Sequence, residues 1–560
     1  VVDNGTTGAS AVPANWTLSA TGPTTVTGPG DSAAVTSQTV PAGSYSLAES
    51  GGPSGYTASA WSCTGGTLTG TSVVVANGAN VTCTITNTAA QPRLTLVKVV
   101  DNGTTGATTA ATAWTMTATG PSTVTGVTGA ASVTNAAVPV GTFNLSEAGP
   151  AGYSASNWVC TGAASSTATS VTLALASSAT CTITNTAIAP RLTLVKQVVN
   201  ANGGTALPTA WTLTGAGPVT ITGTTGSAAV TNAAVRVGAY TLSESTGPAG
   251  YTPSAWTCTG GTLSGSTVTV ALATNATCTI TNTDQPATLT LVKRVDNGTT
   301  GGTGTPANWT LTATGPATVT GPGNSAAVTN QTVPAGSYTL LESGGLPGYT
   351  ASDWSCTGGA LVAGAVTVPN GGNVTCTITN TAVPAHLTLV KQVVNQAGGT
   401  AVPTAWTLTA AGSTTITGAT GSGSVTNVVV PIGPYTLSET GPAGYSASAW
   451  SCTGATVSGA TVTVPLGANV ICTIVNTDQP ATLTLVKVVD NGTTGASATP
   501  ANWTLSATGP TTVTGPGNSA SVTNQTVPAG SYSLAESGGP AGYTASSWSC
   551  TGGTLTGTSV

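Results

Sequence analysis

Alternating apolar and hydroxyl side chains mark many short segments of this chain as β-strands. In Leu94-Thr95-Leu96-Val97-Lys98 and in Cys83-Thr84-Ile85-Thr86-Asn87, apolar residues recur at nearly every second position, which is the periodicity of half-buried strands. Asn-Gly, Gly-Pro and Gly-Gly pairs separate such segments at intervals typical of a β-sandwich. The pattern therefore predicts an all-β fold without helices.

The strand pattern repeats along the whole chain. The segment Leu-Thr-Leu-Val-Lys recurs every 96 to 98 residues, ending at Lys98, Lys196, Lys293, Lys391 and Lys487. A unit of this length can form its own core, so we expect a tandem array of Ig-like β-sandwich domains that forms an elongated rod. The expected repeats, numbered 1 to 6, are 1–88 (without its first strand), 94–187, 192–284, 289–382, 387–478 and 483–560 (without its last strands). Proline-centred linkers of about five residues, such as 89–93, 284–288 and 382–386, would make the rod semi-rigid.

Composition excludes several classes of protein. Only 4% of the residues are charged, against roughly 25% in an ordinary soluble domain. The 9 Lys and Arg residues are too few for a nucleic-acid surface, and 39% apolar residues with 12 Trp argue against disorder. No apolar run reaches the length of a membrane-spanning helix.

The cysteines recur in register, two per repeat and 20 or 21 positions apart. One disulfide per repeat fits this spacing best, with buried free thiols or redox chemistry as alternatives. A zinc site would need four ligands from a repeat that offers two cysteines, and we expect no metal and no cofactor. Disulfides imply an oxidising, extracytoplasmic compartment. The expected pairs are Cys63–Cys83, Cys160–Cys181, Cys258–Cys278, Cys356–Cys376 and Cys452–Cys472, and the partner of Cys550 is expected beyond Val560.

Lysine and glutamate each occupy one position of the repeat. All five Lys end the Leu-Thr-Leu-Val-Lys segment, and all six Glu follow a second apolar segment: Glu49, Glu147, Glu244, Glu342, Glu439 and Glu536. Lys98, Glu147 and Asn185 each share a strand face with the apolar residues of their own segment. We therefore expect all three side chains to point into the core.

Two interpretations of this buried group remain open. The first is an internal salt bridge with a hydrogen-bonded Asn beside it, because buried charges are costly unless they are paired. The second is a Lys–Asn isopeptide bond, because burial favours a neutral amine and a protonated acid. The acid would then polarise the Asn carboxamide while the amine attacks its carbon and ammonia leaves. We favour the isopeptide bond.

The order of these motifs resembles a known family. A Lys that closes the opening Leu-Thr-Leu-Val-Lys strand, the stretch Tyr-Thr-Leu-Ser-Glu followed by Gly-Pro-Ala-Gly-Tyr (240–251), and the Asn of Thr-Ile-Thr-Asn are similar to the Cna-B or SpaA-like prealbumin-fold repeats of Gram-positive surface proteins and pilins. The resemblance implies prealbumin-like sandwiches in which the acidic residue promotes the bond. It assigns the isopeptide pairs Lys98–Asn185, Lys196–Asn282, Lys293–Asn380 and Lys391–Asn476, while Asn87 and Lys487 hold the matching positions of repeats 1 and 6.

These features predict a non-enzymatic extracellular structural protein, secreted or attached to a cell surface, that forms a stalk or the body of a filament. Its only chemistry would be the autocatalytic formation of its own isopeptide bonds. The expected partners are copies of itself, the cell wall, or a host or environmental surface. The alternative is a surface adhesin, or a glycan- or ice-binding module, that uses Trp residues or rows of Thr. Most Trp are expected in the core, and His386, in a linker, has no inferred role.

Overall fold

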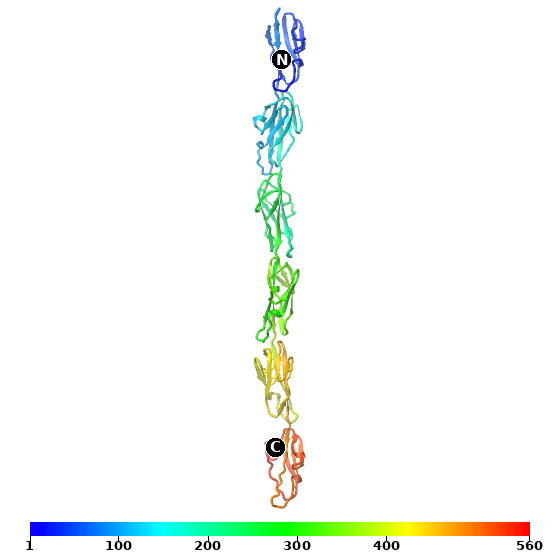
Figure 1. Cartoon of the computed structure of the whole chain (residues 1–560), viewed down its shortest axis with the longest axis vertical. Coiled ribbons are helices and arrows are strands. Elements are labelled where there is room, and N and C mark those ends of the chain that lie inside the picture. Colours follow the sequence, from blue (N-terminus) through cyan, green and yellow to red (C-terminus); the bar gives the residue numbers. More distant parts are fainter. The chain divides into compact units, whose positions relative to one another are not determined.

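The computed structural model describes all 560 residues, and it consists of strands joined by turns and nine single-turn 3-10 helices. The all-β prediction is confirmed. The chain divides into two compact units, Val1–Ala201 with Thr205–Asp284, and Asn202–Gly204 with Gln285–Val560. Each unit contains separate two-sheet bodies along the sequence (Figure 1). The structure contains no helix with the length and apolar character needed to span a membrane.

Repeat 2 illustrates the architecture. One sheet has the strand order β14-β11-β20-β16, with β17 also paired to β20, and the other has the order β13-β12-β15-β19-β18. The first and last strands of the repeat, β11 and β20, are parallel neighbours. The strands are β11 (Arg93–Asp101), β12 (Thr115–Thr119), β13 (Thr123–Gly126), β14 (Ala136–Ala137), β15 (Gly141–Ala148), β16 (Tyr153–Ala155), β17 (Val159–Thr161), β18 (Ser165–Ser166), β19 (Ser170–Leu173) and β20 (Ser178–Ala187).

Repeats 3, 4 and 5 have the same two sheets with the same strand order. Repeat 3 contains β21 (Arg191–Val199), β22 (Leu213–Ala216), β23 (Ile221–Gly223), β24 (Ala233–Ala234), β25 (Gly238–Glu244), β26 (Tyr251–Pro253), β27 (Thr257–Thr259), β28 (Thr262–Ser264), β29 (Thr267–Val270) and β30 (Asn275–Asp284). Repeat 4 contains β31 (Ala287–Asp296), β32 (Trp309–Thr314), β33 (Thr318–Pro322), β34 (Gln331–Val333), β35 (Gly336–Gly344), β36 (Tyr349–Ala351), β37 (Ser355–Thr357), β38 (Ala360–Val362), β39 (Ala365–Val368) and β40 (Asn373–Ala382). Repeat 5 contains β41 (Ala385–Val394), β42 (Thr407–Ala411), β43 (Thr415–Gly418), β44 (Val428–Val430), β45 (Gly433–Thr440), β46 (Tyr445–Ala447), β47 (Ser451–Thr453), β48 (Thr456–Ser458), β49 (Thr461–Val464) and β50 (Asn469–Asp478).

Repeats 1 and 6 contain part of this strand set. Repeat 1 does hold the end of a first strand, because β1 pairs in parallel with β10, which corrects the expectation that this strand is missing altogether. Its strands are β1 (Val2–Asp3), β2 (Trp16–Thr21), β3 (Thr25–Pro29), β4 (Gly43–Gly51), β5 (Tyr56–Ala58), β6 (Ser62–Thr64), β7 (Thr67–Thr69), β8 (Ser72–Val75), β9 (Thr82–Thr84) and β10 (Asn87–Ala89). Repeat 6 contains β51 (Ala481–Leu483), β52 (Trp503–Thr508), β53 (Thr512–Pro516), β54 (Gln525–Val527) and β55 (Ser533–Gly538).

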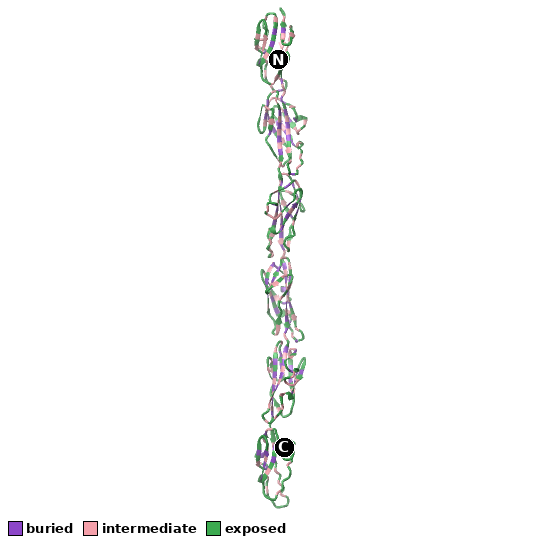
Figure 2. Ribbon diagram, turned by 180° about the vertical axis from the view of Figure 1, so that it is seen from behind, coloured by how far each residue is buried: buried purple, intermediate pink, exposed green.

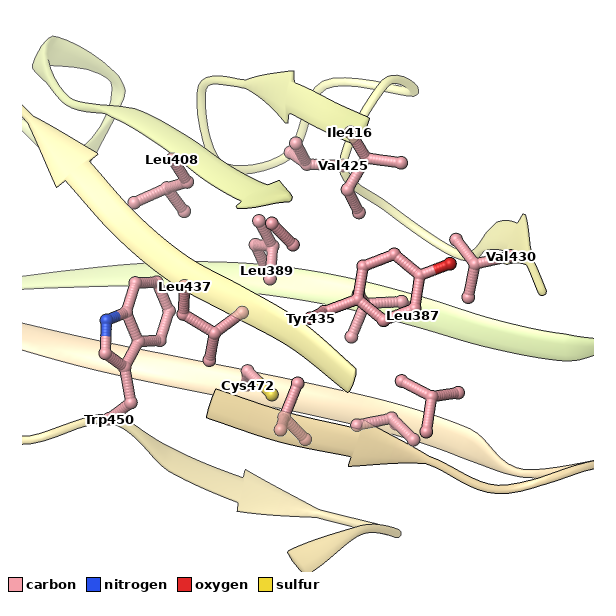
Figure 3. Packing of buried hydrophobic residues seen from close by; sticks show 14 of the residues in the cluster. Leu387, Leu389, Leu408, Ile416, Val425, Val430, Tyr435, Leu437, Trp450 and Cys472 are labelled. Carbon is pink, nitrogen blue, oxygen red and sulfur yellow. The ribbon is translucent and has the colours of Figure 1, made fainter. Parts of the chain in front are cut away.

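Each complete repeat buries a core between its two sheets (Figure 2). Figure 3 shows this core in repeat 5, where Leu389 of β41, Leu437 of β45 and Cys472 of β50 lie between the two layers. Strand alternation produces this arrangement, since every second side chain of each strand faces inward. Trp114 and Trp158 are both buried, so the interpretation of these Trp as core residues is confirmed.

The five predicted disulfides are present, and Cys550 is a free cysteine. In repeat 2, Cys160 on β17 lies directly opposite Cys181 on β20. Each bond therefore fastens a three-residue edge strand to the last strand, or in repeat 1 to its fragment β9. Closing a loop of this length stabilises a repeat by about 3 kcal/mol through the unfolded chain.

The strands extend further into the linkers than expected. Strand β40 ends at Ala382 and β41 begins at Ala385, so two residues join the strands instead of the expected five. His386 therefore lies in β41 and not in a linker, and its Nδ1 lies 3.2 Å from the carbonyl oxygen of Asn427. The strands continue because the first residues of β41 already find hydrogen-bonding partners in β44 and β50.

A buried tyrosine anchors one loop in five of the six repeats. The hydroxyl of Tyr435 donates to the carbonyl oxygen of Pro431, four residues earlier, at 2.9 Å. Tyr45, Tyr338 and Tyr532 make the same contact with a proline carbonyl in their own repeats, and Tyr240 donates to the carbonyl oxygen of Arg236, also four residues earlier. Repeat 2 has Phe143 at this position, so it lacks this hydrogen bond.

Candidate functional site

Three strands bring Lys, Glu and Asn together inside each complete repeat. In repeat 2, Lys98 lies on β11 and Asn185 lies on the adjacent β20, whereas Glu147 lies on β15 in the facing sheet. Lys98 pairs in register with Ile183, so Asn185 follows two residues further along the same face. Lys98 and Asn185 are 3% and 4% exposed. The prediction that these side chains point into the core is confirmed.

A short ion pair joins Lys and Glu at every site that contains both. Lys98 Nζ lies 2.5 Å from Oε2 of Glu147, and the lysine side chain is fully buried whereas that of the glutamate is 12% exposed. The corresponding distances are 2.5 Å for Lys196–Glu244, 2.7 Å for Lys293–Glu342, 2.6 Å for Lys391–Glu439 and 2.8 Å for Lys487–Glu536. The glutamate is thus the part of the buried group nearest to solvent.

In repeats 1 and 3 the asparagine donates a hydrogen bond to the glutamate of its own repeat. In repeat 3, Asn282 Nδ2 donates to Oε1 of Glu244 at 3.0 Å, and in repeat 1, Asn87 donates to Glu49 at 2.6 Å. The other end of the amide is unsatisfied in repeats 2 to 5, where the buried Oδ1 atoms of Asn185, Asn282, Asn380 and Asn476 have no hydrogen-bond partner. A buried acceptor without a donor costs about 1–3 kcal/mol. The site therefore holds an amide carbonyl that lacks a proton donor.

An indole ring covers the lysine, and sequence reasoning missed this contact. Lys98 Nζ lies 5.0 Å from the ring centroid of Trp114, and the other four lysines lie 4.5 to 5.0 Å from their own Trp. Tyr153 packs edge-on against Trp114 and donates its hydroxyl to Oδ1 of Asn102. Each of these Trp follows its Lys by 15 or 16 residues, and this regular spacing is the sequence signal from which the contact could be predicted.

Burial lowers the pKa of the lysines in the four complete repeats. It lowers the pKa of Lys98, Lys196, Lys293 and Lys391 below the ordinary value of 10.5. The hydrogen bond and the negative charge of the partner glutamate offset only part of this effect. The site therefore brings each amine closer to its neutral, nucleophilic form.

A second buried carboxylate, also missed from the sequence, occurs in repeats 3 and 5. Asp478, the last residue of β50, accepts hydrogen bonds from the backbone N–H groups of Gln396, Ala397 and Gly399, each at 2.7 Å. Burial alone would raise the pKa of Asp478, but these three bonds, together with one from its own backbone N–H, outweigh burial and lower it. In repeat 3, Asp284 accepts from the N–H of Ala201. The sequence signal is Thr-Asp-Gln-Pro at the end of these two repeats, where repeats 1, 2 and 4 have Thr-Ala.

The fold and the recurring Lys, Glu and Asn define a class of tandem β-sandwich repeats whose first and last strands are neighbours. The chain belongs to the SpaA_2 prealbumin-like fold domain family, whose model matches residues 1–85, 89–183, 188–280, 284–378, 382–474 and 478–560. No curated protein matches the chain at a significant level.

Several solved structures of bacterial proteins are similar to this chain. The Bacillus anthracis TIE protein is 17% identical over 60% of this chain and 60% of its own, with a TM-score of 0.31. The major pilin T-13 of Streptococcus pyogenes is 14% identical over 35% of this chain and 97% of its own, with a TM-score of 0.17. Two B repeats of the Staphylococcus aureus collagen-binding protein are 13% identical over 68% of this chain and 97% of their own, with a TM-score of 0.14.

Proposed function

We propose that this chain is an extracellular structural protein, a stalk or the body of a filament, whose repeats are closed by Lys–Asn isopeptide bonds as well as by disulfides. One observation carries the proposal: Lys196 and Asn282 contact the same carboxylate, that of Glu244. The ranges 94–187, 192–284, 289–382 and 387–478 are then the units that each close one bond.

The contacts support a specific order of steps. Transfer of a proton along the 2.5 Å Lys98–Glu147 hydrogen bond converts ammonium and carboxylate into amine and acid. In repeat 3 the Nδ2 end of the Asn282 amide faces the glutamate. If Asn185 starts in the same orientation, rotation of its amide by half a turn points Oδ1 at this acid, which then polarises the carbonyl. Lys98 Nζ attacks Cγ, the Cγ–Nδ2 bond breaks, and Nδ2 takes one proton from the attacking amine and leaves as ammonia. The carboxyl of Glu147 ends protonated, so all atoms and charges balance.

The bond would change how a repeat carries tension. A Lys98–Asn185 bond joins the first strand of the repeat to the last, so a pull along the chain passes from β11 to β20 across one amide. The residues between them, including the disulfide, are bypassed. This behaviour suits a protein that works under tension outside the cell, where disulfides persist.

The sheet that carries Glu has an outer face whose composition suits contacts between copies of the chain. In all six repeats, Glu is the only charged residue of these strands, and it points inward. The outer positions are mainly Thr and Ser, with cross-strand hydroxyl pairs such as Thr117–Thr125 at 2.9 Å and Thr312–Thr320 at 2.8 Å. Like charges, which normally keep surfaces apart, are absent here, and hydroxyl groups both donate and accept. We assign this face, which we call the hydroxyl face, to lateral contacts with a second copy.

The alternative function, a surface adhesin or a glycan- or ice-binding module, would use the same hydroxyl face. A Trp platform is disfavoured, because Trp114 and Trp158 are buried in repeat 2 and their counterparts in repeat 3 are buried too. Sedimentation velocity separates the candidates. Lys substitutions at Thr117, Thr214, Thr312 and Thr409 should abolish self-association, whereas Lys at Thr95 in the other sheet should not. Binding to a glycan array without self-association would favour the alternative.

Peptide mapping tests the proposed bond at single sites. A reduced digest of the chain should contain branched peptides that join the Lys196 and Asn282 segments. Glu244→Gln should remove this branched peptide alone, because an amide is a poor proton shuttle, and should leave those of the other three complete repeats. If only linear peptides are found, the lysine and glutamate form a structural ion pair and the proposed chemistry is wrong.

A further inference from the structure

The first and last strands of each complete repeat form the longest pairing in the fold. Strands β11 and β20 are parallel and share nine register pairs, from Arg93–Ser178 to Asp101–Thr186. Nine pairs also join β21 to β30, β31 to β40 and β41 to β50. The other edge of β11 pairs only at Arg93 and Leu94, with β14. Strand β11 is therefore held in its sheet almost entirely by β20.

The direction of these strands determines how tension acts on them. The chain enters a repeat at the start of β11 and leaves it at the end of β20. Because the strands are parallel, these two points lie at opposite ends of the pair. A pull on the chain therefore drives the strands past each other along their own axes and loads all interstrand hydrogen bonds together, instead of opening them one after another.

Repeats 1 and 6 provide an internal comparison, because neither contains the full pair. In repeat 1, where β1 supplies two residues, the segment that matches β20 is split into β9 (Thr82–Thr84) and β10 (Asn87–Ala89). In repeat 6, strand β51 ends at Leu483, although its sequence continues as in β11.

We propose that this parallel pair, which we call the terminal-strand clamp, is a second mechanical element that resists tension without any isopeptide bond. The proposal goes beyond the proposed function, since it holds whether or not the bond forms. The clamp also keeps the proposed reactants aligned. A slip of two residues would shift Asn185 by about 6.6 Å along Lys98, which would separate the amine from the amide.

Single-molecule force spectroscopy on the full chain tests the clamp apart from the bond. The chain with Glu147→Gln, Glu244→Gln, Glu342→Gln and Glu439→Gln lacks the proposed proton shuttle. We expect its four complete repeats to unfold in separate steps, each at a higher force than the steps of repeats 1 and 6. Unfolding of all repeats at the same low force would overturn the clamp.

A proline substitution that removes one backbone N–H donor of β11 provides an independent test of the clamp. The N–H of Lys98 donates to Thr128, away from β20, so the N–H of Val97 faces β20, because alternate residues of a parallel strand point to opposite sides. Val97→Pro in the Glu→Gln chain should lower the unfolding force of repeat 2 alone, whereas Thr125→Pro on edge strand β13, as a matched control, should not. Far-UV circular dichroism verifies that both variants fold, and equal forces in both would contradict the clamp.

If the unsubstituted chain extends as far as the Glu→Gln chain while the forces stay high, the isopeptide proposal fails and the clamp stands.

Discussion

Lys196 and Asn282 lie on neighbouring parallel strands and contact opposite oxygens of one carboxylate, that of Glu244, at 2.5 and 3.0 Å. An ion pair alone would need only the lysine and the glutamate. The asparagine adds a buried carbonyl without a donor, which is a cost unless it takes part in chemistry. The same three residue types recur at the same positions in four repeats, and this recurrence supports the proposed bond.

The stability of the uncrosslinked chain should rise with pH. In the folded chain, burial lowers the lysine pKa below the 10.5 of the unfolded chain, so the unfolded state binds more protons between these two values. Stability therefore increases as pH rises through the folded-state pKa toward 10.5. Urea titrations of the fourfold Glu→Gln chain, carried from neutral pH up toward pH 10.5, should show midpoints that rise once the pH passes the lowered lysine pKa.

Replacing the four lysines by methionine in that variant provides the control, because it removes the titrating amines. This chain should show a smaller dependence on pH over the same range. Equal slopes for the two chains would contradict the assignment of the effect to the buried lysines.

Asp478→Asn should loosen the loop after β41. The substitution replaces a charged acceptor of three backbone N–H bonds by a neutral amide, which accepts fewer and weaker bonds. Hydrogen exchange should show lost protection at Gln396, Ala397 and Gly399, whereas Asp353→Asn at an exposed site should leave these amides unchanged.

The pH dependence of this loop follows from the lowered pKa of Asp478. A carboxylate with a lowered pKa stabilises the fold above its ordinary pKa, and the stabilisation is lost as pH falls through the folded-state value. Protection should therefore persist at pH 5 and decline only in stronger acid. Decline at the ordinary Asp pKa of about 3.9 or above would contradict the account.

Phe143→Tyr should stabilise repeat 2. The new hydroxyl can donate to the carbonyl oxygen of Pro139, as Tyr435 does to Pro431 at 2.9 Å, and such a bond contributes about 1 kcal/mol. Tyr435→Phe should destabilise repeat 5 by a similar amount. Hydrogen exchange within each repeat measures both changes, and a loss of protection around the substituted residue of repeat 2 would show that its loop cannot accept the hydroxyl.

Thiol labelling checks the redox state that the five disulfides imply. When the unreduced chain is denatured and alkylated, Cys550 alone should react. Alkylation at both cysteines of every repeat would remove the argument for an extracytoplasmic compartment.

Features that depend on neighbouring residues could be predicted from the sequence, whereas features that depend on contacts between distant segments could not. The inward orientation of Lys98, Glu147 and Asn185 follows from the two-residue period of a strand, which depends on neighbouring residues alone. The cover of Trp114 over Lys98 depends on how the two sheets stack, and the parallel pairing of β11 with β20 joins segments at opposite ends of the repeat. The proline-centred pattern around Pro384 predicts a linker at His386, whereas strand β41 begins at Ala385, directly after this proline. The loop that Asp478 holds depends on backbone N–H directions, which composition does not encode.

The mass of the intact chain tests the central proposal most directly. High-resolution mass spectrometry of the reduced, denatured protein should give a mass below that of the sequence by four molecules of ammonia, one for each repeat that contains Lys, Glu and Asn. The fourfold Glu→Gln chain, treated in the same way, should retain all four. An unsubstituted chain at the full sequence mass would contradict the isopeptide bonds and leave repeats closed by disulfides alone.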